Sequence, residues 1–267
     1  MKRLRAQRRA AKAQSRRVVP VPREGPLQCT HQQEGLWFLH QMDPSSAMYH
    51  IPFVVRLRGA LDVEALRRAL LFLVARHEAL RTRFVAEGGV PRQVIGPPPP
   101  SLSMPVVDVA AADVDQWVVG EVDRPMDLAA GVFRADLGRI AADEHVLLMV
   151  VHHIAADGWS VGILAGELSY VYSAEARGVA PTLPALAVQP ADHAAWQRAW
   201  LDGAELERQV GYWREALAGL AHLDLPTDRP RPAEPTGAGV LALRPLPADL
   251  SVAARAYART NGHRSSS

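Results

Sequence analysis

Six consecutive apolar residues in the run HVLLMVVHH (145–153) constrain the fold more than any other stretch. A strand with one side in solvent alternates apolar and polar residues, whereas a strand buried on both faces is apolar throughout. We therefore predict that this run is the central strand of a sheet with other elements packed on both faces. The decapeptide VHHIAADGWS (151–160) begins at the end of this strand.

Strands and helices are predicted on both sides of this run, but they do not alternate strictly. HIPFVVRLRG (50–59) alternates as a half-buried strand does, and 61–76 carries a helical leucine stripe after Asp62, a favoured N-cap residue type. This mixture predicts an α+β fold. The other expected elements are a helix at 32–42, a hairpin at 84–95, strands at 104–109 and 133–140, helices at 111–122, 160–178, 191–202 and 204–219, a strand at 239–246, and a last helix capped by Asp249 or Ser251.

Composition limits the class of protein. The chain has 267 residues, of which 48% are hydrophobic, so it can bury one large core or two small ones. It has no apolar run long enough to span a membrane and no apolar segment of a secretory signal. The single cysteine, Cys29, excludes an internal disulfide and is typical of a reducing compartment. We expect a cytoplasmic protein in which Cys29 is a small buried hydrophobic residue.

The net charge of +2 hides an asymmetry along the chain. Residues 1–23 carry nine of the 30 basic residues and no acidic one, so the remaining 21 basic residues face 28 acidic residues, a net charge of −7. Such an arm could contact nucleic acid, a membrane surface or an acidic partner. Because it lacks interleaved aromatic residues, and like-charge runs usually stay solvated, we favour a disordered leader or linker at 1–26. We expect no nucleic acid and no membrane as partners.

The two adjacent histidines of the decapeptide cannot serve one site together if the strand continues through them. Successive side chains of a strand point to opposite faces, so one of His152 and His153 is expected inside the fold, and the other at the strand's end. This argues against a metal site that also uses Asp157, because zinc ligands converge on one point. We therefore expect no bound metal.

A strand that ends in a histidine and leads through a glycine turn into a helix suits acyl transfer. A neutral imidazole accepts a proton near neutral pH, and the free N–H groups of a helix beginning near Trp159 or Ser160 favour developing negative charge. Asp157 could orient a histidine or pair with an arginine. Direct attack of a bound nucleophile on a bound acyl donor, without a covalent enzyme intermediate, is the simplest reaction. The same residues are equally compatible with a buried histidine pair and a structural turn.

Five stretches, in order and spacing, resemble the motifs of condensation domains of non-ribosomal peptide synthetases. This family belongs to the chloramphenicol-acetyltransferase-like acyltransferases, and its hallmark is His-His-x-x-x-Asp-Gly. The matching stretches are VHHIAADGWS, THQQEGLWFLHQM (30–42) with Gln33, Leu36 and Trp37, RHEALRTRF (76–84), QPADHAAWQR (189–198) with Asp192 and Trp196, and GYWREALAGL (211–220) followed by LDLPTDRPRP (223–232).

The resemblance implies an α+β lobe of the chloramphenicol-acetyltransferase type, with a mixed or antiparallel sheet flanked by helices. We assign 27–232 to the N-terminal lobe of a condensation domain, 1–26 to the leader, and 233–267 to the start of a second, truncated lobe. A complete condensation domain has two similar lobes with a tunnel between them, and its later motifs do not occur in this sequence. We therefore expect this chain to need a second half for activity.

The resemblance also implies a reaction. An amine on a downstream carrier domain attacks an acyl or peptidyl thioester on an upstream carrier domain, and an amide forms. His153, the second motif histidine, is expected to be the catalytic residue, as general base or by positioning the amine. An α-amino group has a pKa near 8, so little base strength is needed. No cofactor is expected to bind directly, because 4'-phosphopantetheine arms of the carriers hold the substrates; an adenylation domain is a further candidate partner.

Three neighbours of His153 are given supporting roles by the same resemblance. His152 is expected to be structural. Asp157 is expected to form a salt bridge with an arginine from the later part of the family's sequence, so in this chain it would be a buried carboxylate without its partner. Gly158 is expected to permit the turn and to place a backbone N–H near the oxyanion.

Four more residues are expected to support the site. Trp159 should pack under the loop, next to Ser160. Arg76 and Arg81 are either solvated charges at a helix end or members of ion pairs near the site.

Two alternatives to the condensation reaction remain open. A related acyltransferase would use soluble CoA thioesters or form an ester, although the stretch LPTDRPRP (225–232) favours the peptide synthetase branch. A non-catalytic fragment would keep the fold and bind a carrier domain without turnover.

Overall fold

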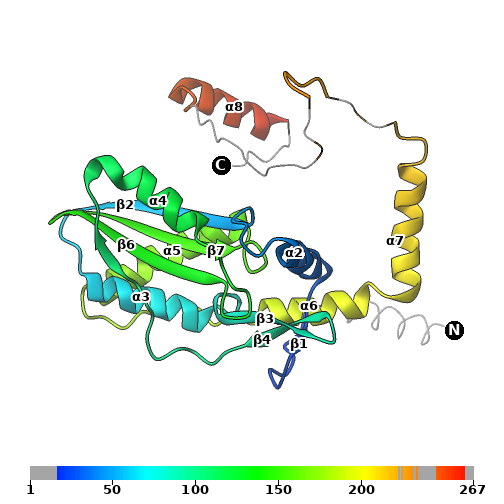
Figure 1. Ribbon diagram of the computed structural model, residues 1–267, viewed down its shortest axis with the longest axis horizontal. Coiled ribbons are helices and arrows are strands. Elements are labelled where there is room, and N and C mark those ends of the chain that lie inside the picture. The colour runs from blue at the N-terminus through cyan, green and yellow to red at the C-terminus, as the bar shows by residue number, and fades with distance from the viewer. Residues whose placement is uncertain (1–16, 222, 224, 231–232, 234–244, 262–267) are drawn as a thin grey trace. The chain divides into compact units, whose positions relative to one another are not determined.

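The structure is a computed structural model that describes residues 17–221, 223, 225–230, 233 and 245–261 (Figure 1). The chain divides into two compact units, Met1–Leu220 and Ala221–Ser267, and each is described by itself. Among the described residues, none of the helices combines the length and the apolar character needed to cross a bilayer.

Most of the predicted elements within the described residues are present, with bounds shifted by a few residues. In the larger unit they are β1 (Leu27–Gln28), α2 (His31–Met42), β2 (His50–Arg58), α3 (Val63–Arg76), the 3-10 helix η1 (Glu78–Arg81), β3 (Thr82–Glu87), β4 (Val90–Ile95), β5 (Val106–Asp108), the 3-10 helix η2 (Ala111–Asp113), α4 (Val114–Asp123), β6 (Phe133–Ala141), β7 (Glu144–His152), α5 (Gly158–Glu175), α6 (Pro190–Trp200) and α7 (Gly203–Ala216).

The smaller unit contains α8 (Ala248–Thr260). The predicted cap of this helix is wrong: it begins after Pro247 without a side-chain cap, and Asp249 lies within its first turn. The strand predicted at 239–246 lies outside the described residues except for its last two positions, which are not in a strand.

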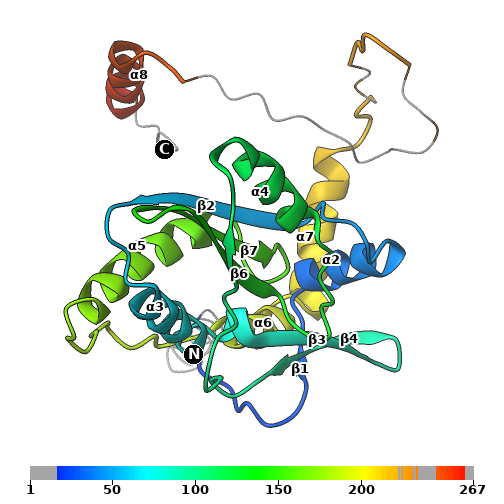
Figure 2. The same ribbon diagram turned by 60° about the vertical axis from the view of Figure 1, so that its left-hand side comes forward.

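The apolar run forms the central strand that its sequence predicts. β7 lies between β2 and β6 in a four-stranded sheet of order β2-β7-β6-β5, antiparallel to both neighbours, while β5 runs parallel to β6. Every residue of β7 after Glu144 is buried. Figures 1 and 2 show α3 and α5 on one face of this sheet and α4 on the other. Alternate β7 residues pack to the two sides: Leu147, Met149 and Val151 with α3 and α5, and Val146, Leu148 and Val150 with α4 and the residues that flank it.

A second, three-stranded antiparallel sheet of order β1-β4-β3 adjoins the end of β7. Its hairpin turns at Gly88 and Gly89, whose φ angles of 56° and 83° are those that a tight two-residue hairpin turn requires. Phe84 of β3 packs with Cys29 and Ile154 in one buried cluster. The second sheet thus supports the loop that follows the central strand, and the two sheets together confirm the α+β class.

The segment just before β1 is bound to the body of the larger unit. The backbone N–H of Val21 donates to Asp192 Oδ1 at 2.8 Å, and the Arg23 guanidinium donates to both Asp192 carboxylate oxygens at 2.7 and 2.9 Å. Arg23 also pairs with Glu78 at 2.8 Å. These contacts were not expected from the sequence, because residues 1–26 were assigned to a leader or linker.

Candidate active site

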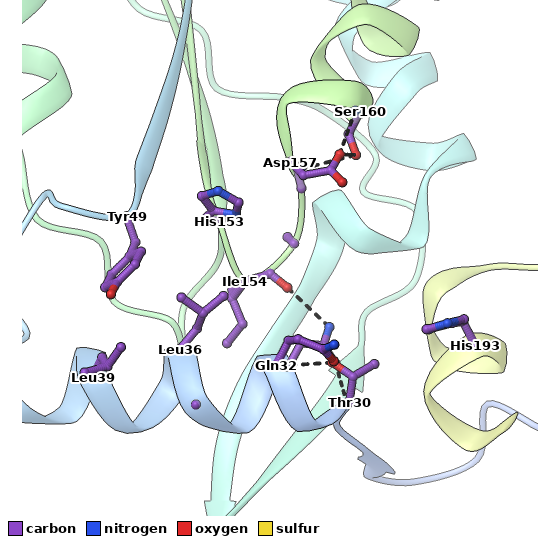
Figure 3. A pocket seen from close by; sticks show the side chains of 14 residues that line it. Thr30, Gln32, Leu36, Leu39, Tyr49, His153, Ile154, Asp157, Ser160 and His193 are labelled. Carbon is purple, nitrogen blue, oxygen red and sulfur yellow. Dashed lines mark hydrogen bonds between the residues drawn. The ribbon is translucent and has the colours of Figure 1, made fainter. Parts of the chain in front are cut away.

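The end of β7 separates the two motif histidines. His152 is 1% exposed and faces the interior, whereas the side chain of His153 is exposed. His153 lines a pocket of about 710 Å³ formed by α2, the loop after β7, the start of α5 and α6. Figure 3 shows its imidazole in this pocket, with Leu36, Leu39 and Tyr49 on one side and Asp157 on the other. The two side chains point in opposite directions, although β7 ends at His152 and His153 is the first residue of the turn that follows.

His152 is held as a neutral, buried group. Its Nδ1 accepts a hydrogen bond from the backbone N–H of Ile154 at 3.1 Å. Its ring lies 5.7 Å from that of His40 and 5.9 Å from that of His50. Burial, together with these neighbouring histidines and His153, lowers the pKa of His152 to about 4. These contacts support the structural role predicted for His152.

Asp157 is the N-cap of α5, and the prediction of a buried, unpaired carboxylate is wrong. Its Oδ1 accepts from the Ser160 backbone N–H at 2.8 Å and from Ser160 Oγ at 2.6 Å. Ser160 Oγ in turn accepts from the Asp157 N–H at 3.3 Å, which completes a capping box. The hydrogen bonds from Ser160 lower the pKa of Asp157. In this chain the carboxylate is exposed and hydrogen-bonded to Ser160, so it is not a buried charge without a partner.

Gly158 and Trp159 differ from their predicted roles. Gly158 is the first residue of α5, its φ angle is not positive, and an added Cβ would meet no atom within 4 Å. The turn therefore does not require glycine at this position. Trp159 is 81% exposed, so it does not pack under the loop. Both residues still contribute N–H groups that lack an intrahelical partner at the start of the helix.

The stretch GWSVG (158–162) fits the Gly-x-Ser-x-Gly pattern of a nucleophile elbow, a match that sequence reasoning overlooked. In such an elbow the serine sits on a strained strand-to-helix turn and exposes its hydroxyl. Here Ser160 is the third residue of a regular helix, its hydroxyl donates to the cap Asp157, and no described residue other than glycine has a positive φ. The serine is thus a capping residue in this structure.

Cys29, the single cysteine of the chain, is a buried structural residue. Cys29 is fully buried, and burial raises the pKa of its thiol to about 12, so it does not form a thiolate nucleophile at neutral pH. Within the described part of the chain, no three His, Cys, Asp or Glu residues are arranged to hold a metal ion.

Arg76 and Arg81 do not line the His153 pocket. Arg76 pairs with Glu167 of α5 at 3.2 Å, and His77 Nε2 lies 2.6 Å from the same carboxylate, so this ion pair joins α3 to α5. The Arg81 guanidinium donates to the carbonyl oxygens of Gly96 and Ala75. Arg76 is therefore a member of an ion pair, which is one of the two predicted alternatives. Arg81 donates to backbone carbonyls, which neither alternative included.

Sequence reasoning gave no role to three residues that the fold brings to the site. Tyr49 and His193 line the pocket, and Gln33 contacts the loop after His153. For Gln33 a signal existed, because it matches the first family motif. His193 lies within the matching stretch 189–198, although that match pointed to Asp192 and Trp196. For Tyr49, no periodicity or spacing places the residue near position 153.

Comparison with known proteins decides the family. The family model described as "Condensation domain" matches residues 23–260, nearly the whole chain. This chain belongs to the condensation-domain family. Members of this family form amide bonds in nonribosomal peptide synthesis, and the fold is that of chloramphenicol-acetyltransferase-like proteins. The family match extends beyond the predicted lobe, 27–232, at both ends.

The curated relatives of this condensation domain are large synthetases. It is 41% identical to malpibaldin synthetase of Mortierella alpina in an alignment that covers 93% of this chain and 5% of the relative. It is 40% identical to the probable non-canonical nonribosomal peptide synthetase CymA of Salinispora arenicola in an alignment that covers 92% of this chain and 3% of the relative. The chain therefore spans only a small part of these proteins.

Solved condensation-type structures share the fold. The X-domain from teicoplanin biosynthesis superposes with a TM-score of 0.78 and 32% identity, over 93% of this chain and 56% of that one. The first condensation domain of the calcium-dependent antibiotic synthetase, solved with a substrate analogue, gives a TM-score of 0.65 and 26% identity over 74% of this chain and 49% of that one. This condensation domain thus spans about half the length of these solved chains.

Proposed function

We propose that this chain forms one wall of a site that joins a carrier-bound acyl or peptidyl thioester to a carrier-bound aminoacyl amine, with His153 as the catalytic residue. The observation that carries the proposal is the contrast between the two motif histidines. His153 is exposed in the pocket, while His152 is buried and kept neutral beneath it. Of the two motif histidines, only His153 lines the pocket where a bound amine would lie.

The chemistry follows from this placement. The amine nitrogen attacks the thioester carbonyl carbon, the carbonyl oxygen takes up negative charge, and the C–S bond then breaks to release the thiol of the donor arm. The nitrogen loses a proton, which ends on the departing sulfur and completes that thiol; His153 transfers this proton or orients the amine by a hydrogen bond. The N–H groups of Gly158 and Trp159, at the positive end of α5, favour the developing oxyanion.

The pocket lining suits a neutral acyl donor. Among its described lining residues there is no lysine or arginine, which a site for a free carboxylate or a phosphate would be expected to contain. A thioester on a 4'-phosphopantetheine arm carries no charge at its reacting end. We therefore propose upstream and downstream carrier domains as the partners, an adenylation domain as a further partner, no directly bound cofactor, and the cytoplasm as the compartment.

Turnover of a histidine variant tests this function. Because the chain spans about half of the solved condensation domains, it is assayed alone and joined to the C-terminal half of a relative. Donor and acceptor are carrier-bound, and the amide is measured by mass spectrometry. We expect turnover only in the joined protein, and a loss of about 100-fold or more in His153→Ala. The exposed His31→Ala variant is the control, and full activity of His153→Ala would refute the proposed role.

The same assay separates the related functions. Amide or ester formation from a soluble CoA thioester, without a carrier-bound donor, would indicate a CoA-dependent acyltransferase. The similar X-domain was solved in a complex with OxyB, which favours protein docking as a second candidate function for this chain. Carrier binding measured by calorimetry, with no turnover in the joined protein, would support that candidate over catalysis.

A further inference from the structure

The backbone around His153 is held by groups from two remote segments. The Gln33 side chain, on α2, donates from Nε2 to the carbonyl oxygen of Ile154 at 3.2 Å. The dashed line that reaches Ile154 in Figure 3 marks this hydrogen bond. On the other side, the N–H of His153 donates to the carbonyl oxygen of Tyr49 at 2.7 Å. The peptide that follows His153 is held through the Ile154 N–H, which donates to His152 Nδ1 at 3.1 Å, and Gln33 holds the next peptide, between Ile154 and Ala155.

Gln33 is itself fixed in a single orientation. It is 9% exposed, and its Oε1 accepts from the backbone N–H of Thr30 at 2.9 Å. An amide oxygen that accepts there leaves Nε2 as the end that faces Ile154. Nε2 also lies 3.4 Å from Oε1 of Gln93, which is 2% exposed and donates to the Gln28 carbonyl at 2.7 Å. The second sheet thus supports Gln33.

The contact has a consequence for the catalytic histidine. Ile154 is buried in a cluster with Cys29 and Phe84, and its carbonyl oxygen loses its side-chain donor if Gln33 cannot donate. A buried carbonyl without a hydrogen-bond partner is unfavourable. The peptide between Ile154 and Ala155 then rotates toward another donor, and the neighbouring backbone of His153 moves with it. A shift of about 1 Å in a catalytic group can lower the rate by about 100-fold.

We propose that Gln33 is a positioning residue for His153. It acts through the Ile154 carbonyl, and Gln93 keeps its amide in place. The effect on catalysis rests on the function proposed above, but the effect on the orientation of His153 does not. The two are therefore tested by separate measurements.

The decisive variant is Gln33→Glu. A glutamate keeps the length of the side chain and the acceptor for the Thr30 N–H, but an ionised carboxylate cannot donate to Ile154. Gln32→Glu is the matched control: it adds the same charge to the same turn of α2 and the same pocket. Gln32 uses Oε1 to accept from Gln197, a contact that a carboxylate retains.

The primary readout is NMR of the purified 267-residue chain with isotope-labelled histidine. The His153 ring signals are assigned by their loss in His153→Ala. We expect them to shift or split in Gln33→Glu, and to stay close to the wild-type positions in Gln32→Glu. Signals that do not move in Gln33→Glu, or that move equally in both variants, overturn the proposal. If Gln33→Glu fails to fold by circular dichroism, Gln93→Met is judged by the same comparison.

Turnover of the joined protein gives the second readout. We expect Gln33→Glu to lower kcat by about tenfold to 100-fold while KM changes by less than about twofold, because substrate binding is retained and orientation is lost. Gln41→Glu, on the exposed part of α2, is the activity control. An unchanged kcat overturns the positioning role. Full activity of His153→Ala would instead refute the proposed function and leave the NMR result standing.

Discussion

Asp157 accepts two hydrogen bonds from Ser160, from the backbone N–H at 2.8 Å and from Oγ at 2.6 Å. The motif aspartate is thus bound to the helix that it begins. Its carboxylate is exposed and is satisfied within four residues of sequence. This arrangement keeps the start of α5 beside His153 without an arginine from another part of the protein.

The first prediction concerns this cap. Asp157→Ala should lower the free energy of unfolding by about 1 kcal/mol, whereas Asp157→Asn, which can still accept from Ser160, should lose much less. Urea denaturation at pH 7 measures both. Because the pKa of Asp157 is lowered in the folded state, its stabilisation is present above the ordinary carboxyl pKa and is lost as the pH falls through the folded value. Equal losses in the two variants would point to an ion pair instead of a cap.

A related prediction concerns Ser160, which lies in the overlooked Gly-x-Ser-x-Gly match. A capping role predicts that Ser160→Ala lowers stability by about 0.5–1 kcal/mol and leaves amide formation in the joined protein largely intact. Incubation with a carrier-bound donor alone, followed by mass spectrometry of the intact protein, should show no acyl group on the chain. A serine-linked acyl group would show that the hydroxyl is a nucleophile.

A second prediction concerns Arg23 and Asp192. Asp192 is 1% exposed; burial alone would raise its pKa, but the hydrogen bonds from Arg23, Gln189 and Val21 outweigh burial and lower it. Arg23→Met should therefore lower the free energy of unfolding by about 2–3 kcal/mol at pH 7, since it leaves a buried carboxylate with fewer partners.

Thermal and urea unfolding of Arg23→Met, Asp192→Asn and the double variant measure the coupling between the two residues. The double variant should lose less than the sum of the single variants, because the contact between Arg23 and Asp192 is lost in each single variant and can be lost only once. Arg83→Met, an exposed arginine on β3, should change stability by less than about 0.5 kcal/mol. Additive losses would show that the two side chains do not interact.

The third prediction concerns pH and the buried histidines. His152 binds a proton only near pH 4 in the folded chain and near pH 6.5 when unfolded, so below pH 6.5 the unfolded form binds more protons. The free energy of unfolding should therefore fall from pH 6.5 to pH 4, by about 3 kcal/mol from this residue. Burial also lowers the pKa values of His40 and His50, which adds to the same trend.

Stability curves measured between about pH 4 and pH 7.5 test this dependence. His152→Gln can still accept from the Ile154 N–H and does not titrate, so its curve should be flatter over this range. His31→Gln, which replaces an exposed histidine, should follow the wild-type curve. A His152→Gln curve as steep as that of the wild type would contradict the prediction.

The fourth prediction concerns Gly158. It is the first residue of α5, and a Cβ would enter open space, so Gly158→Ala should leave the free energy of unfolding unchanged or slightly raised. If the thioester approaches the helix start closely, the same methyl group should lower turnover of the joined protein by about tenfold or more. Unchanged turnover would mean that the oxyanion does not lie against this N–H.

Local patterns allowed much of the fold to be predicted. The unbroken apolar run required a strand covered on both faces, and β7 is that strand. Asp62 caps its helix by accepting from the N–H of Ala65 at 2.8 Å, as its residue type predicts. The paired glycines at 88 and 89 turn the hairpin. Each signal depends on neighbours a few residues apart, which is why one sequence suffices to find it.

The candidate site could be predicted only in part. Adjacent positions on a strand face opposite ways, so a difference between His152 and His153 could be expected, although β7 ends at His152 and His153 begins the turn. Trp159 shows the limit of such reasoning: a large apolar residue in a motif was expected to be buried, but the start of α5 turns it into solvent. Whether a side chain is buried depends on which other elements pack over it, and a local sequence pattern does not contain that information.

The sequence by itself determined the secondary structure, the family and the identity of the exposed histidine, because these depend on short-range periodicity and on motif residues. Only the tertiary structure decided which remote groups hold the site together. Gln33 contacts Ile154 across 121 positions of sequence, and Arg23 reaches Asp192 across 169. Such pairs form when the packing of α2, the two sheets and α6 brings their side chains within 3.2 Å, and that packing is a property of the whole core.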